Sequence, residues 1–156
     1  MTTQSSEVSD LFMTRVKDWR LNVIYNSSGS STLNISLEPW LLDAIVTFES
    51  ISDQPLTYTV SGSSTEGYFA ETLSLANRVM LSKIMVKSWL QSTINDILQM
   101  NLKIQDRDFK TFSASQNLKA KQDYLNSLKE EISQDMIDYS YKRVDWNSWR
   151  NQVFIR

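Results

Sequence analysis

Two residue types that serve most enzyme active sites are missing from this chain. Its 156 residues include no cysteine and no histidine. Without cysteine, disulfides, zinc–thiolate sites and thiol nucleophiles are excluded. Without histidine, serine or cysteine catalysis through an imidazole base is excluded, and so is the commonest metal ligand. We therefore expect no catalytic residue, no cofactor and no metal, although carboxylate pairs, Lys or Tyr bases and oxygen-ligand sites stay chemically possible.

The scarcity of glycine, of clustered basic residues and of long apolar stretches argues against further classes of protein. The chain has only three glycines, so a glycine-rich phosphate loop is absent. The net charge is −2 with basic residues spread along the chain, which lacks the footprint of an autonomous DNA binder. Lys83 and Lys87 interrupt the longest apolar stretches, and residues 1–9 do not resemble a signal peptide. We expect a protein made in a cytoplasm, with no membrane partner.

The residues that are present indicate a folded, mostly helical chain. Apolar residues make up 41 % and charged residues 22 %, which is typical of a globular domain. Apolar spacing predicts helices over 7–26, from about Leu37 to about 49, over 68–102 and over 113–143. The first would be capped by Ser6 or Ser9, and 27–32 reads as a flexible polar connection. We predict an all-α bundle of about four helices, with the 68–102 helix at its centre.

Two segments fall outside this helical pattern. Residues 50–67 form a long loop in which Leu56, Tyr58 and Val60 alternate, so a short strand is possible. Such a loop either contacts a neighbouring subunit or is a disordered surface segment. The chain divides into a helical domain, 1–143, and an extended aromatic tail, 144–156.

That C-terminal tail is the main candidate binding site. Aromatic side chains bury large apolar areas and are enriched at interface hot spots. The tail would either dock onto a partner subunit or fold back on its own bundle, and we favour docking because little of the chain's own core is left to cover. Its candidate contact residues are Trp146, Trp149, Val153, Phe154 and Ile155.

The charged clusters allow a chemical and a structural interpretation. Asp96, Asp106 and Asp108 suggest a divalent-cation site, but their spacing differs from an EF-hand loop, which favours capping and local ion pairs. Paired carboxylates on the last helix are more typical of a solvated face than of acid–base catalysis; they are Glu130, Glu131, Asp135 and Asp138. Lys83 and Lys87 either face an acidic or nucleic-acid partner or extend past core residues into solvent.

Three stretches together resemble the small helical head-to-tail connector, or adaptor, proteins of tailed bacteriophages. They are residues 38–45 (EPWLLDAI), 100–110 (MNLKIQDRDFK) and 117–119 (NLK), and the order of helices agrees over roughly residues 11–143. The resemblance implies a ring of about twelve copies that docks under the portal protein and carries the next neck or tail component. It also implies that DNA passes the channel without specific binding, and that the aromatic tail reaches the portal. The implied location is the virion.

Two other classes remain open on the sequence. The chain is alternatively a different virion part, such as a tail-completion, neck or head protein. It is otherwise a small helical binding module or assembly chaperone. A ring with a central channel separates the connector from both.

Overall fold

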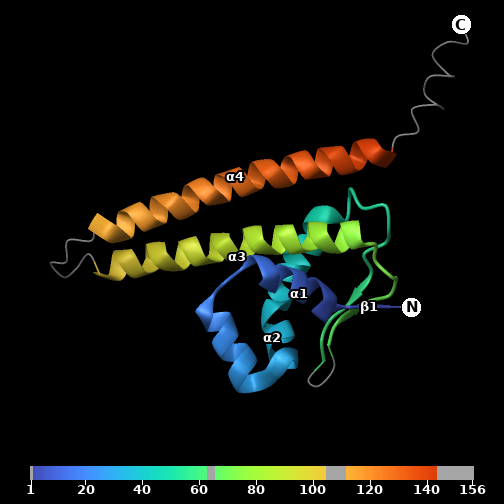
Figure 1. Ribbon diagram of the computed structural model, residues 1–156, viewed down its shortest axis with the longest axis horizontal. Helices are drawn as coiled ribbons and strands as arrows, with labels where there is room; N and C mark the ends of the chain where they lie inside the picture. The colour runs from blue at the N-terminus through green and yellow to red at the C-terminus, as the bar shows by residue number, and fades with distance from the viewer. Residues whose placement is uncertain (1, 63–65, 105–111, 144–156) are drawn as a thin grey trace, which may run out of the picture.

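The fold is a helical bundle in which one helix is covered from two sides. The computed structural model describes residues 2–62, 66–104 and 112–143. Four helices are found in these ranges: α1 Ser5–Arg15, α2 Trp19–Phe48, α3 Leu75–Ile104 and α4 Phe112–Arg143. Helix α4 runs alongside α3 on one side, and α1 and α2 pack on the other (Figure 1). The predicted all-α bundle is confirmed.

Helix α3 is buried around most of its circumference because it lies between these two layers. Apolar and small polar side chains on several of its faces are buried. They are Asn77, Met80, Leu81, Ser82, Ile84, Met85, Val86, Leu90, Thr93 and Ile94. The centrality predicted for this helix is therefore confirmed. The predicted start of this helix at residue 68 is wrong, because Tyr68–Phe69 form a strand and the helix begins only at Leu75.

The predicted single helix over 7–26 is wrong, because the helix is interrupted between Arg15 and Trp19. Val16 has an extended backbone (φ −108°, ψ 112°), and Asp18 caps the next helix by accepting a hydrogen bond from the Arg20 N–H at 2.9 Å. Aspartate is a favoured N-cap, which makes a new helix start there favourable. Helix α1 itself starts one residue after Gln4, which forms a capping box with Glu7, so neither Ser6 nor Ser9 is the cap.

The predicted flexible connection over 27–32 is also wrong, because helix continues on both sides of Gly29. Gly29 adopts a left-handed φ of 84°, and this produces the kink within α2. The neighbouring hydroxyls bond carbonyls of the same helix, as in Thr32 to the Ser28 carbonyl at 3.0 Å. The helix predicted from Leu37 thus begins earlier, and Pro39 lies inside it rather than in its first turn.

A small antiparallel sheet closes the end of the bundle near the N-terminus. Strands β1 Thr3–Gln4, β3 Tyr68–Phe69 and β2 Tyr58–Thr59 lie in that order. Thr3 pairs with Phe69, and Tyr58 pairs with Phe69 from the other side. Phe69 is fully buried, with its ring centroid 4.9 Å from that of Tyr58. The strand suggested within the 50–67 loop is confirmed at Tyr58–Thr59.

Helix α4 agrees closely with the helix predicted over 113–143. Its inward face buries Leu125, Leu128 and Ile132, with Met136 and Tyr139 partly buried beyond them. The apolar face of this helix therefore packs on α3 as the residue spacing predicts. The predicted tail, 144–156, lies outside the described residues.

The described residues between β2 and β3 are held against α2 through partly buried hydrogen bonds. The Glu38 carboxylate accepts from the Tyr58 hydroxyl and from the Ser61 N–H, each at 2.8 Å. The Asn34 amide donates to Glu66 at 3.0 Å. Gly67 fits beneath this network because it has no side chain: a Cβ there would overlap the Tyr58 hydroxyl and lie 2.9 Å from Glu38 Oε1.

We predict that Gly67→Ala destabilises the fold by about 1–3 kcal/mol, because the added methyl group forces Tyr58 off Glu38. Urea unfolding measures the change. Gly62→Ala is the matched control in the same loop, since a Cβ at Gly62 meets nothing within 4 Å. Equal unfolding free energies for the two variants would contradict this account of the loop.

Candidate interaction site

The main candidate binding site from the sequence, the aromatic tail, lies outside the described residues. Trp146, Trp149, Val153, Phe154 and Ile155 are therefore not placed by the structure. The same holds for Asp106 and Asp108. Asp96 is placed, exposed on α3. Among the residues described, no group of three or more acidic side chains is arranged to hold a metal ion.

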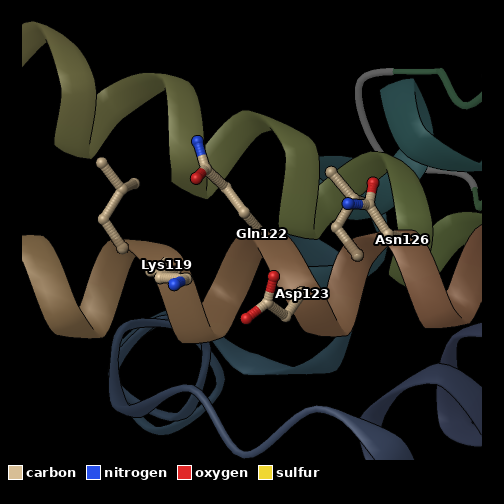
Figure 2. Close-up of a pocket in the computed structure, with 6 residues that line it drawn as sticks. Lys119, Gln122, Asp123 and Asn126 are labelled. Atoms are coloured by element: carbon tan, nitrogen blue, oxygen red, sulfur yellow. The ribbon is translucent and has the colours of Figure 1, made fainter.

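A depression lies along α4, on the part of the helix around Gln122. Its volume is about 560 Å³, and Figure 2 shows the side chains that line it. They are Leu118, Lys119, Gln122, Asp123, Leu125 and Asn126. In Figure 2, Gln122 and Asn126 extend from α4 toward α3, whereas Lys119 and Asp123 lie in front of the α4 ribbon. The lining mixes one cation, one anion, two amides and two leucines, and all of its polar side chains are exposed, which indicates a solvated surface.

The carboxylates of α4 bind a lysine of α3. Lys83 Nζ lies 2.7 Å from Glu131 Oε1 and also pairs closely with Asp135. Burial lowers the pKa of Lys83, but the hydrogen bonds and charges of Asp135 and Glu131 outweigh burial and raise it. Lys83 therefore stays charged and links the two long helices, where the sequence had suggested an outside partner or a free ammonium group. Asp138 accepts a hydrogen bond from Gln134 at 2.9 Å.

A second polar cluster, which the sequence did not reveal, joins α4 to α3 and to the segment after α2. The Tyr139 hydroxyl donates to the Asp53 carboxylate and lies 2.6 Å from Asn77 Oδ1. The fully buried Asn77 side chain donates to Asp53 at 3.0 Å and to Gln54 at 2.7 Å. The Tyr139 ring also packs edge-on against Phe48 at a centroid distance of 5.2 Å. This cluster fixes the position of α4 over the core.

Two phenols have raised pKa values in these clusters, and in both the cause is structural. Burial raises the pKa of Tyr139, and its hydrogen bond to the Asp53 carboxylate raises it further. Burial and the Glu38 carboxylate raise the pKa of Tyr58 in the same way. A phenol with a raised pKa stays protonated and is a poor base, so these groups act as hydrogen-bond donors that hold segments together.

A polar groove lies between α2 and α3, on the side of α3 opposite to α4. It has a volume of about 400 Å³. Residues of α2 and α3 line it: Trp40, Asp43, Ser88, Gln91, Ser92, Asn95 and Asp96. Ser88 donates a hydrogen bond to Asp43 across the helix pair. The described lining contains two carboxylates and no basic side chain, so the groove favours a cationic or hydrogen-bonding partner.

Large apolar side chains are exposed on α2 at two places. Trp19 and Val23 lie one turn apart at its beginning, and Trp19 is 71 % exposed. Ile35, Leu42 and Val46 lie on the part after Gly29, and Val46 is 75 % exposed. Exposed apolar side chains that share one face of a helix are candidates for a contact site in a protein of this kind. None of these residues was among the contact residues predicted from the sequence, because each belongs to a helix that also buries apolar residues.

Comparisons of the chain with protein-family models, with curated proteins and with solved structures find no match. Over the residues described, no helix combines the length and the apolar character needed to cross a membrane. The function is therefore inferred from the surfaces of this chain itself.

We predict that Tyr139→Phe lowers the unfolding free energy by about 1–2 kcal/mol at neutral pH, because Asp53 and Asn77 lose a hydrogen-bond partner. The raised folded-state pKa means that this tyrosine contributes its full stability below the unfolded pKa of about 10. That contribution is lost as pH rises from there through the folded pKa, so the variant should lose less stability than wild type at alkaline pH.

Urea unfolding between neutral and alkaline pH measures both the loss of stability at neutral pH and its dependence on pH. Tyr124→Phe on the same helix is the control, since Tyr124 is 54 % exposed. A Tyr139→Phe variant as stable as the Tyr124→Phe variant would show that the cluster does not hold α4 in place.

Proposed function

We propose that this chain is a structural protein of a virion, a ring-forming head-to-tail connector that docks under the portal and extends the DNA channel toward the tail. The observation that carries the proposal is the exposed apolar surface of α2, which needs a macromolecular partner to cover it. The resemblance of residues 38–45, 100–110 and 117–119 to connector proteins supplies the kind of assembly. The chain acts by assembly, and its partners are further copies of itself, the portal and the next neck component.

The elongated pair α3 and α4 suits this role physically. Each helix has about 30 residues, which corresponds to a length of about 45 Å. The Lys83 ion pairs and the Tyr139 cluster hold the two helices together. The pair is therefore suited to bridge two neighbouring components. The tail follows α4 in the sequence, and Trp146, Trp149 and Phe154 are among its proposed contact residues.

Other classes lead to different behaviour in solution. A different neck, tail-completion or head protein would assemble without a central channel. A helical binding module or assembly chaperone would be a monomer or dimer whose mass and stability do not depend on the tail. These alternatives are separated by particle shape and mass.

We predict that the purified full chain forms closed rings with a central channel, visible by electron microscopy. A chain ending at Arg143 should assemble about tenfold less well or worse, because the aromatic docking area is removed. The triple variant Trp146→Ala, Trp149→Ala, Phe154→Ala, which keeps the full length, should behave like the shortened chain.

Light scattering measures the mass of each species, and urea unfolding checks that the bundle remains folded. A monomer or dimer with the same mass and stability with and without the tail would contradict the connector and favour the binding module.

A further inference from the structure

Helix α2 carries a second apolar face beyond the one that it buries. After Gly29, its inner face packs into the core through Leu33, Leu37, Leu41, Ala44, Ile45 and Phe48. A separate row, Ile35, Pro39, Leu42 and Val46, is exposed and follows steps of four, three and four residues. We call this row the outer α2 face. Such spacing forms a seam for packing against another helix, and a helix apolar on two sides is normally covered on both.

The surroundings of the outer α2 face are acidic. The sequence has no Lys or Arg between Arg20 and Arg78, whereas six acidic residues fall in that interval. Two of the six, Asp43 and Glu49, are exposed next to the row. Asp43 also lines the groove between α2 and α3, together with Asp96. The outer α2 face and this groove thus present apolar groups flanked by three carboxylates.

The beginning of the same helix has the complementary chemistry. Trp19 and Val23 project into solvent one turn apart, and Arg15, Lys17 and Arg20 are exposed beside them. We call these five residues the basic edge. Asp18, which caps α2, lies 3.7 Å from Arg20 Nε. The edge therefore presents two apolar side chains among three cations, and no carboxylate of the described residues forms an ion pair with Arg15 or Lys17.

We propose that the basic edge of one copy packs on the outer α2 face of a second copy. Trp19 and Val23 cover the apolar row, and the cations of the edge approach Asp43, Glu49 and Asp96. Tryptophan and arginine are the residues most enriched at interface hot spots. The contact joins two different surfaces, so it repeats from copy to copy along an assembly. It deepens the proposed function and rests on the self-assembly proposed there.

Charge decides between this pairing and the two symmetric ones. Two outer α2 faces brought together would place Asp43 and Glu49 of each copy against those of the other, and two basic edges would place six cations together. Like charges at an interface disfavour association, whereas opposite charges steer it. Only the pairing of the basic edge with the outer α2 face covers the apolar side chains of both surfaces and also places opposite charges together.

The test uses two variants that each remove one half of the contact. One carries Val46→Lys and Glu49→Lys and keeps the basic edge; the other carries Trp19→Ser and Arg20→Glu and keeps the outer α2 face. All four side chains are exposed, so both variants should unfold at the wild-type urea midpoint. The single changes Glu49→Lys and Arg20→Glu form a milder pair if either double variant is unstable.

Sedimentation velocity then measures association of the full chain. Wild type should associate with rising concentration, and each variant alone should associate at least about tenfold more weakly. Their equimolar mixture retains one intact contact and should form a complex of twice the 18.1 kDa chain mass, without larger species. Ile137→Lys, an exposed change on α4, which packs on the other side of α3 from α2, is the control and should associate like wild type.

A wild-type chain that stays monomeric, a double variant that associates like wild type, or a mixture without the paired complex would each overturn the contact. These failures differ from failure of the connector. If both variants assemble normally and only loss of 144–156 abolishes rings, the contact is wrong and the connector stands. If the mixture pairs as expected but rings with a channel never form, the contact stands and the connector is wrong.

Discussion

The burial of α3 between two layers is the constraint on which the rest of the structure depends. Its apolar side chains point in several directions, so α1 and α2 must cover one side and α4 the other. Each layer is then fixed by polar contacts that only this arrangement allows. Arg78 pairs with Glu7 of α1, and Lys83 pairs with Glu131 and Asp135 of α4. The α2 surface that faces away from α3 is left exposed by the same geometry.

The parts of the fold that were predictable are those in which one apolar face repeats over many turns. Helix α4 was placed within a residue, and the interior of α3 was recognised, because Leu, Ile and Met recur at helical spacing. The errors arise where a local interaction overrides that pattern. Asp18 starts a new helix although apolar spacing continues across it, and Gly29 kinks a helix that its serines suggested was a loop. Tyr68 and Phe69 pair with residues distant in the sequence, which periodicity cannot reveal.

The site was less predictable than the fold. The Tyr139 cluster gathers residues 53, 77 and 139 from three segments, so no local signal identifies it. The outer α2 face was within reach of the sequence, because Ile35, Leu42 and Val46 share a helical face. It was missed because the helix was expected to begin at Leu37. The aromatic tail was singled out by composition alone and stays a prediction.

The central claim is that this chain works by covering its own exposed α2 surfaces with further copies, and a cross-link measures that contact directly. Because the chain has no cysteine, Val46→Cys and Val23→Cys place single thiols on the outer α2 face and on the basic edge. Copies of the two variants, differing in mass tag, are mixed and treated with a short bis-maleimide. The account predicts cross-linked pairs that contain one copy of each variant. Pairs formed as readily between two Val46→Cys copies, or no pairs in the mixture, would contradict it.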